Sequence, residues 1–166
     1  MKTNSKIQTR ITQYLREQKI PFRLLPHKTP AISIDDAARQ RGISPSIMVK
    51  CILLKDMEGC YVLACVSGNE QADPRKVRTV LSSRRITCAP ATEIESVTGY
   101  SLDCVAPILL TTTIPVIFDK KITLLERVTI SSGSNMAGIE LNLDDLLILT
   151  SPIISEISRN PPPLNQ

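Results

Sequence analysis

The sequence predicts a single α/β domain around a largely antiparallel or mixed sheet, and three observations favour this fold class. The 166 residues suffice for one hydrophobic core. Segments with helical spacing of apolar residues are mixed with short apolar segments of strand length. Two of these strands flank residues 56–59, which have the composition of a hairpin turn and favour antiparallel pairing over a doubly wound parallel sheet.

The first third of the chain predicts two helices and a short strand. Apolar residues recur at helical spacing through about the first 18 residues, so we expect a helix that ends before Pro21. Residues 22–24 alternate as a short strand, and a loop follows. Ser33 and Asp36 have the spacing of a capping box, which predicts a second helix that Gly42 ends.

The middle of the chain predicts the centre of the sheet. Residues 47–54 and 60–66 are apolar on both faces, so we expect both strands to be buried in the sheet. Asp73 followed by proline is typical of a helix start, and this helix should run through residue 81. Residues 85–89 should return as a strand.

The last third predicts two more helices. Thr92 and Glu95 again have capping-box spacing, and Gly99 should end that helix. Asn142 should cap a final apolar helix that ends near residue 150. Strands are expected at 105–110, 115–118, 127–131 and 139–141.

Composition excludes several classes of protein. The hydrophobic fraction of 42% and the charged fraction of 22% are those of an ordinary globular domain. No apolar run approaches the roughly 20 residues of a membrane helix, and the amino terminus lacks the apolar segment of a secretory signal. We therefore expect a cytoplasmic protein with no membrane partner.

Cysteine and histidine usage argues against a metal centre. The five cysteines are an odd number and none forms a CxxC pair, which favours reduced, buried thiols over disulfides or zinc ligands. His27 is the single histidine, so few metal ligands remain. Neither GxGxxG nor a Walker loop occurs, and we expect no metal and no cofactor.

Lys50 lies in the middle of one of the most apolar stretches of the chain, residues 47–54. Removing an unpaired charge from water costs on the order of several kcal/mol, so this lysine needs an explanation. A pocket in which the ammonium meets a carboxylate, a phosphate or a substrate carbonyl is one. A strand-edge lysine whose ammonium reaches back to water is the other. The stretch alone leaves both open.

A basic segment is the second charged feature of a chain whose net charge is +4. Between Pro74 and Thr92 there is no acidic residue. Such a segment could neutralise phosphates of an RNA, or it could be the solvated face of a helix. Its five basic residues are Arg75, Lys76, Arg78, Arg84 and Arg85.

Four landmarks follow one another along the chain, and together they resemble the YbaK-like family of prolyl-tRNA-synthetase-associated editing domains. The landmarks are the loop 27–30, Lys50 in its apolar strand, residues 98–100 running on to Pro107, and 131–133 followed by 138–141. The resemblance covers roughly residues 8–158. It implies a curved, barrel-like mixed sheet flanked by helices, with residues 1–158 as the editing domain and 159–166 as a flexible Pro-rich tail.

The function that this resemblance implies is hydrolysis of the ester in a wrongly charged tRNA. A synthetic site for proline cannot strongly exclude smaller amino acids, because one methylene is worth only about 1 to 3 kcal/mol. A free-standing deacylase acting in trans would correct proline tRNA that carries a small noncognate amino acid. The partners would be misacylated tRNA and possibly prolyl-tRNA synthetase. In the family the substrate's own ribose hydroxyl is thought to help activate the water.

The resemblance also implies which residues form the site. Lys50 matches a strand lysine that helps hold the terminal adenosine or its phosphate, which favours the functional explanation for it. The family's GxxxP loop, whose backbone packs against the ester, aligns with Asp103, Cys104, Val105, Ala106 and Pro107, with Asp103 in place of glycine. A side chain there could block the pocket, pair with Lys50, or accept the ammonium of the aminoacyl group.

A second loop completes the implied site. Ser131, Ser132 and Gly133 match a serine-glycine-glycine run, so the Ser131 hydroxyl and nearby N–H groups could face the ester; a plain turn between strands is the alternative. His27 matches a histidine at the pocket rim, and a structural histidine bonding a turn is the alternative. Gly138 is a further candidate for substrate binding.

Two other functions stay open beside deacylation. Asp103 could make the protein a degenerate editing-domain homologue that binds tRNA or a synthetase without hydrolysis. A thiol redox protein would rest on the five cysteines alone.

Overall fold

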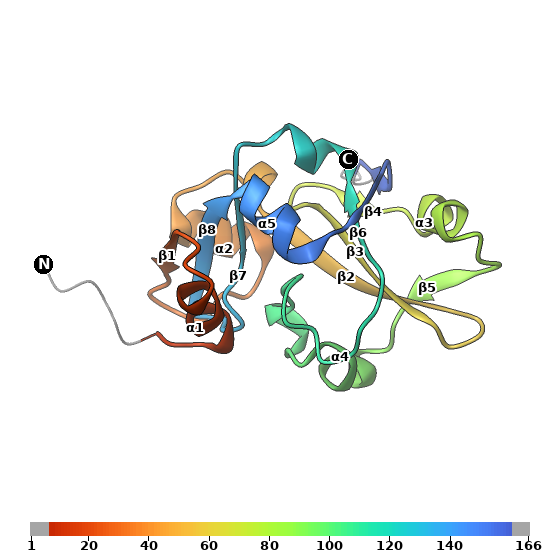
Figure 1. The fold of residues 1–166 in the computed structure, drawn as a ribbon, viewed down its shortest axis with the longest axis horizontal. Coiled ribbons are helices and arrows are strands. Elements are labelled where there is room, and N and C mark those ends of the chain that lie inside the picture. Colours follow the sequence, from red (N-terminus) through yellow and green to blue (C-terminus); the bar gives the residue numbers. More distant parts are fainter. Residues whose placement is uncertain (1–6, 161–166) are drawn as a thin grey trace, which may run out of the picture.

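The computed structural model describes residues 7–160, which fold into five α-helices, three short 3-10 helices and ten strands (Figure 1). The helices are α1 (Arg10–Glu17), α2 (Ile34–Arg41), α3 (Pro74–Leu81), α4 (Ala91–Thr98) and α5 (Leu143–Thr150). The 3-10 helices are η1 (Pro45–Ile47), η2 (Leu102–Cys104) and η3 (Lys120–Leu124). Within this part of the chain, none of the helices combines the length and the apolar character that crossing a bilayer requires.

The strands form one mixed sheet of five strands and two smaller antiparallel sheets. The five-stranded sheet has the order β5 (Ile86–Cys88), β2 (Val49–Asp56), β3 (Tyr61–Ser67), β6 (Val116–Asp119) and β9 (Ile153–Ser155). In it, β3–β6 and β6–β9 are parallel pairs. The three-stranded sheet has the order β1 (Phe22–Pro26), β8 (Ala137–Asn142) and β7 (Arg127–Ser131), and β10 (Ser158–Arg159) pairs with β4 (Gln71–Ala72).

The predicted fold class is confirmed: helices and a largely antiparallel, mixed set of strands share one core. The hairpin β2–β3 lies inside the large sheet, as the apolar character of both strands predicts. A parallel bridge between Met48 and Thr129 joins the large sheet to the three-stranded one. Closure into a barrel is not found among residues 7–160.

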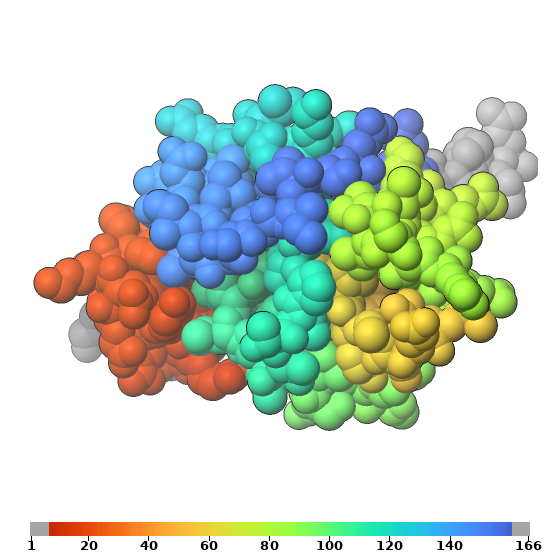
Figure 2. Space-filling view, turned by 45° about the vertical axis from the view of Figure 1, so that its right-hand side comes forward, coloured from red at the N-terminus to blue at the C-terminus, as the bar shows by residue number. Residues whose placement is uncertain are grey.

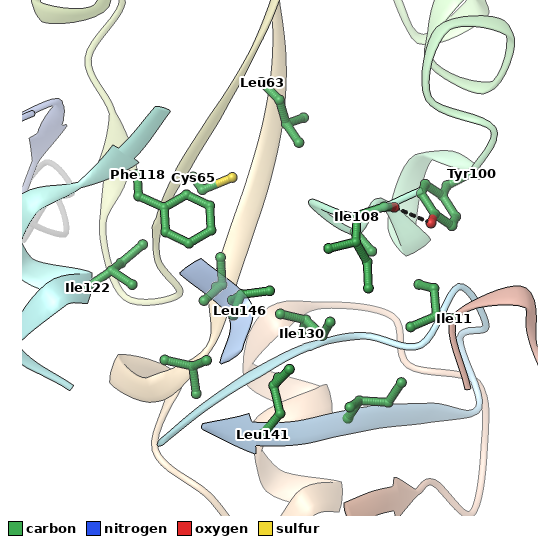
Figure 3. Close-up of a cluster of buried hydrophobic side chains, with 14 of the residues drawn as sticks. Ile11, Leu63, Cys65, Tyr100, Ile108, Phe118, Ile122, Ile130, Leu141 and Leu146 are labelled. Atoms are coloured by element: carbon green, nitrogen blue, oxygen red, sulfur yellow. Dashed lines mark hydrogen bonds between the residues drawn. The ribbon is translucent and has the colours of Figure 1, made fainter. Parts of the chain in front are cut away.

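The large hydrophobic cluster fills the space between the two larger sheets. Figure 3 shows Ile130 and Leu141 of the three-stranded sheet facing Leu63 and Phe118 of the five-stranded sheet, with Leu146 of α5 among them. A second cluster, which includes Leu54, Val62 and Val77, lies under α3. Alternate residues of β2 therefore face different clusters, which is why both faces of this strand are apolar.

Local signals set most helix ends where the sequence predicts them. The Ser33 hydroxyl accepts a hydrogen bond from the N–H of Asp36, and Gly42 ends α2 with a left-handed φ of 69°. Gly99 ends α4 in the same way, with φ 83°. Helix α1 begins at Arg10 after the cap Thr9, later than predicted, and residues 1–6 lie outside the described part.

One predicted cap is wrong, and a second takes the predicted N-cap position without the side-chain capping bond. Helix α4 begins at Ala91, so Thr92 lies inside the helix and cannot cap it. Asn142 precedes α5, but its side-chain oxygen accepts a hydrogen bond from Arg127 Nη1 across the sheet instead of from the helix N–H groups. The cross-strand arginine competes for the same oxygen.

The predicted strand at 105–110 is a loop. The hydroxyl of Tyr100 donates to the C=O of Ile108 at 2.5 Å, a bond that Figure 3 shows, and Leu109 takes a left-handed φ of 55°. Both features bend the segment away from an extended conformation. Its apolar residues are explained by packing: Ala106 and Ile108 belong to the large cluster.

The thiols and the C-terminal boundary differ in part from the prediction. All five cysteines are free, and Cys65 and Cys104 are buried, but Cys60 and Cys88 are exposed. Arg159 belongs to β10 and pairs with Gln71, so the ordered ladder continues one residue past the predicted boundary at 158. The expected flexible tail, 159–166, otherwise falls mostly on residues 161–166, outside the described part.

Asp119 should be a main determinant of stability, because its buried carboxylate joins the end of β6 to the C-terminal segment. One oxygen accepts from the N–H groups of Ile157 and Ser158 at 2.9 and 3.1 Å, and the other accepts from the N–H of Lys121 at 3.2 Å. Asp119→Ala leaves these donors unpaired and should lower the free energy of unfolding by about 2 to 4 kcal/mol in urea titrations.

Two further variants test whether the loss of stability comes from the buried carboxylate of Asp119. Asp119→Asn keeps one acceptor oxygen and should lose less, while Asp144→Ala removes an exposed carboxylate and should change stability by less than about 1 kcal/mol. An Asp119→Ala protein as stable as Asp144→Ala would contradict this role.

Candidate functional site

A cavity of about 450 Å³ lies between α2, the edge of β2, the segment 102–105 and the turn that follows β7. Among the predicted site residues, the structure brings five to this cavity: His27, Lys50, Asp103, Val105 and Ser131. These residues come from four separate parts of the sequence. Their convergence makes the cavity the candidate active site.

Strand β2 leaves part of its edge unpaired at this cavity. Strand β5 pairs only with residues 54–56, and the N–H of Ala89 donates to the C=O of Leu53 at 2.9 Å, so the peptide groups of Leu53 face this edge. Peptide groups two residues apart in a strand point the same way. The N–H and C=O of Cys51 therefore face the cavity, with no strand of the described part beside them.

Lys50 lies at the rim of the cavity and is half-buried. Its ammonium donates a hydrogen bond to the backbone C=O of Glu70. Burial lowers the pKa of Lys50, while the nearby carboxylates of Asp35 and Glu70 act in the opposite direction. The ammonium is thus partly satisfied by a backbone carbonyl of the protein itself, and its role in substrate binding stays a prediction.

Asp103 is exposed on η2 and borders the cavity. The proposed pairing with Lys50 is wrong, because the ammonium of Lys50 contacts Glu70 instead and no ion pair of Asp103 occurs within residues 7–160. The other two readings of Asp103, a blocked pocket or a carboxylate that receives an ammonium, stay open.

Ser131 joins the two loops that border the cavity. Its hydroxyl donates to the C=O of Cys104 at 2.8 Å and accepts from the N–H of Gly133 at 3.0 Å. Ser132 is fully buried and donates to the C=O of Ala137 at 2.7 Å. The hydroxyls of both serines are therefore engaged in holding the turn, in agreement with the structural alternative for this loop.

Several predicted binding residues support the cavity rather than line it. Cys104 and Ala106 are 4% and 0% exposed, and Pro107 is buried beside them. Gly133 takes a left-handed φ of 89° in the turn. None of these four residues borders the cavity, and Ser132 and Gly138 do not either.

His27 is a buried structural histidine as well as a cavity residue. Its Nε2 receives a hydrogen bond from Arg41 Nε at 2.9 Å, so Nδ1 carries the proton and donates to the C=O of Asn135 at 2.8 Å. Burial is the main cause that lowers the pKa of His27, and the Arg41 charge adds to it. A neutral His27 thus positions the Arg41 side chain.

Arg41 and Thr129 are cavity residues that sequence reasoning missed. Arg41 lies in the last turn of α2, where a basic residue is ordinary because it suits the helix dipole, so no sequence signal distinguishes it. Thr129 lies in β7, and a threonine in a strand is equally ordinary. Only the fold brings the two residues to one cavity.

The basic segment forms a separate surface around α3 and β5, which we call the arginine patch. Arg75, Arg78 and Arg85 border a smaller hollow of about 310 Å³ together with Arg159. Figure 2 shows the segment around α3, in yellow-green, beside the blue C-terminal segment on one face of the molecule. The hollow shares no lining residue with the cavity.

The other two basic residues of the segment are more engaged with the protein. The ammonium of Lys76 contacts Glu156 at 3.3 Å and the C=O of Ser158 at 2.8 Å. Arg84 is exposed, and its C=O accepts a hydrogen bond from Arg78.

In the described part of the chain, no three His, Cys, Asp or Glu side chains are grouped closely enough to hold a metal ion.

Sequence relatives share names that concern tRNA. A protein of Enterococcus faecalis named "Putative Cys-tRNA(Pro)/Cys-tRNA(Cys) deacylase EbsC" is 20% identical over 159 residues, which are 95% of this chain and 97% of that protein. A proline–tRNA ligase of Bacillus licheniformis is 33% identical over 92 residues. These are 55% of this chain but only 16% of the ligase.

The fold has a solved counterpart. A crystal structure described as that of a "putative trans-editing enzyme for prolyl tRNA synthetase" superposes with a TM-score of 0.75 at 20% identity, covering 84% of this chain and 87% of the other. The family model described as "Aminoacyl-tRNA editing domain" matches residues 28–149, a stretch that contains every residue identified above as lining the cavity except His27. This chain therefore belongs to the aminoacyl-tRNA editing domain family.

Proposed function

We propose that this protein is a trans-acting aminoacyl-tRNA deacylase that hydrolyses the ester of misacylated tRNA. The observation that carries the proposal is the cavity itself, where segments far apart in the sequence of an editing-domain chain converge on unpaired peptide groups of a strand edge. We further propose that it acts in the cytoplasm on proline tRNA carrying a small noncognate amino acid, with prolyl-tRNA synthetase as a possible partner.

The chemistry requires little from the side chains. Water adds to the ester carbonyl, and the ester C–O bond then breaks, which releases the amino acid and returns a proton to the ribose oxygen. In our proposal the ribose hydroxyl next to the ester helps to orient the water. The N–H of Cys51 is placed to donate a hydrogen bond to the ligand at the open edge, and such fixed donors stabilise the developing oxyanion.

Asp103 is the residue that decides between this proposal and an alternative. As an exposed carboxylate without an ion-pair partner in residues 7–160, it could receive the α-ammonium of the aminoacyl group and narrow the amino-acid preference. Alternatively, it blocks the approach of the ester, and the protein is a degenerate homologue that binds tRNA or a synthetase without hydrolysis.

A screen of misacylated tRNAs tests the proposed activity. Purified protein should deacylate at least one charged tRNA, with proline tRNA charged with alanine or cysteine tried first. Lys50→Ala removes the ammonium that holds the Glu70 loop at the rim, so its rate should be lower by about tenfold or more. If no charged tRNA loses its amino acid faster with the wild type than with Lys50→Ala, the deacylase proposal fails.

Asp103→Gly separates the two roles of the carboxylate. If Asp103 receives the ammonium, the variant should raise KM for the preferred charged tRNA by about tenfold, because a charge-assisted hydrogen bond is lost. If Asp103 blocks the cavity, a wild-type protein without activity should gain activity in the variant. Equal steady-state constants for an active wild type and the variant would exclude both roles.

We propose in addition that the arginine patch contacts tRNA phosphates. The double variant Arg75→Gln, Arg78→Gln should bind tRNA more weakly, and the slope of log affinity against log salt should fall by about one per lost contact. Arg23→Gln, an exposed arginine of β1 that pairs with Glu140, serves as the control with an equal type of charge change. The same salt slope in the patch variant as in the wild type would show that the patch is a solvated helix face.

A further inference from the structure

Arg41 is a cation at the cavity wall that has no counter-ion among residues 7–160. The side chain is half-buried, and burial lowers its pKa to about 10, still far above neutral pH. Within residues 7–160 its hydrogen bonds reduce to the one from Nε to His27, and it makes no ion pair. The terminal nitrogens Nη1 and Nη2 therefore make no hydrogen bond to the described residues.

The orientation of this guanidinium is fixed from two sides. His27 holds Nε, and the ring of His27 is itself held by the C=O of Asn135. The guanidinium also lies directly on the backbone of Gly138, where any Cβ would overlap its carbon and nitrogen atoms. Gly138 thus acts through Arg41, because only glycine leaves room for the guanidinium at this place in β8.

A second polar group at the cavity has no partner either. Thr129 is fully buried and borders the cavity, and its hydroxyl oxygen has no hydrogen-bond partner in the described structure. A buried hydroxyl without a partner is costly, so a ligand that pairs with it is favoured. In the β7–β8 register Thr129 is the diagonal neighbour of Gly138, so the backbones of the two residues lie about 7 to 8 Å apart on one sheet.

Lys50 is less suited than Arg41 to bind an anion. Its ammonium already donates to the C=O of Glu70 and is close to the carboxylates of Asp35 and Glu70. An incoming anion would meet that negative charge. In the described part of the chain Arg41 has no carboxylate paired with it, and it presents two parallel donors, the geometry that suits a phosphate.

We propose that Arg41, with the hydroxyl of Thr129, forms a phosphate subsite inside the cavity that holds the 5′-phosphate of the terminal nucleotide of the bound tRNA. This inference rests on the proposed function for the source of the phosphate. The geometry itself requires only a nucleotide whose phosphate enters the cavity. Arg41 is then the residue that positions the 3′ end for hydrolysis.

Binding of small ligands tests the subsite without the reaction. Isothermal titration or NMR titration compares AMP, adenosine and inorganic phosphate. AMP should bind about tenfold or more tightly than adenosine, and Arg41→Gln should abolish this difference while leaving adenosine binding unchanged. Thr129→Val, which is isosteric, should reduce the AMP preference by a smaller factor.

Matched variants keep the result interpretable. Arg39→Gln changes the same charge on the same helix at an exposed position and should keep the AMP preference. Thermal unfolding shows whether Arg41→Gln folds. If it does not, Arg41→Lys replaces it, because lysine retains the charge but not the two parallel donors. Loss of the preference in Lys50→Ala but not in Arg41→Gln would overturn the proposal. Inorganic phosphate binding as tightly as AMP would also overturn it, in favour of a free-anion site.

The reaction provides an independent comparison. With charged tRNA, Arg41→Gln should raise KM with a smaller effect on kcat, because the phosphate is bound in both ground and transition states. If the wild type deacylates tRNA but Arg41→Gln has the same KM and the same AMP preference, the subsite is wrong and the function stands. If no tRNA is deacylated but the AMP preference depends on Arg41, the function is wrong and the subsite stands.

Discussion

Strand β2 exposes the peptide groups of Cys51 because the neighbouring strand β5 stops after three paired residues. In the observed register, Cys88 lies opposite Leu54, so Pro90 would come opposite Ile52 and Ala91 opposite Cys51. Pro90 is instead the N-cap residue of α4, with φ −58°, so the chain turns into the helix where the ladder would otherwise continue. The start of α4 therefore ends the strand pairing, and the cavity, the loops and the arginine of α2 surround the open edge that is left.

The walls around this edge are held by hydrogen bonds between loops that are distant in sequence. Ser131 bonds the C=O of Cys104, and Tyr100 bonds the C=O of Ile108. These bonds explain why the family-like residues at 104, 106 and 107 are buried while only 103 and 105 face the cavity. The backbone shape of the 102–108 loop is thus the functional element, and most of its side chains serve to fix that shape.

Sequence reasoning predicted the elements whose signals are local. Gly42, Gly99 and the Ser33 cap act within one turn of chain, and the two-sided apolar character of residues 47–54 follows from burial between two clusters. The sequence does not predict the loop at 105–110, because its shape depends on hydrogen bonds from Tyr100 and Ser131. It does not predict the role of Arg41 either, because that role depends on Gly138, 97 positions away, and on the absence of an ion-pair partner for Arg41 among residues 7–160.

Charge in the cavity is arranged as the proposed ligand requires. Arg41 is half-buried and uncompensated in the described structure, Lys50 is compensated by Glu70 and Asp35, and Asp103 is an exposed residue that borders the cavity. The 3′ end of an aminoacyl-tRNA carries a phosphate on its last nucleotide and an ammonium on its amino acid. A cation and a carboxylate that border the same cavity would bind these two charges with the ester between them. On this argument Asp103, which replaces glycine in the loop, and Arg41 bind opposite charges of one ligand, so each residue helps to orient the group that the other binds.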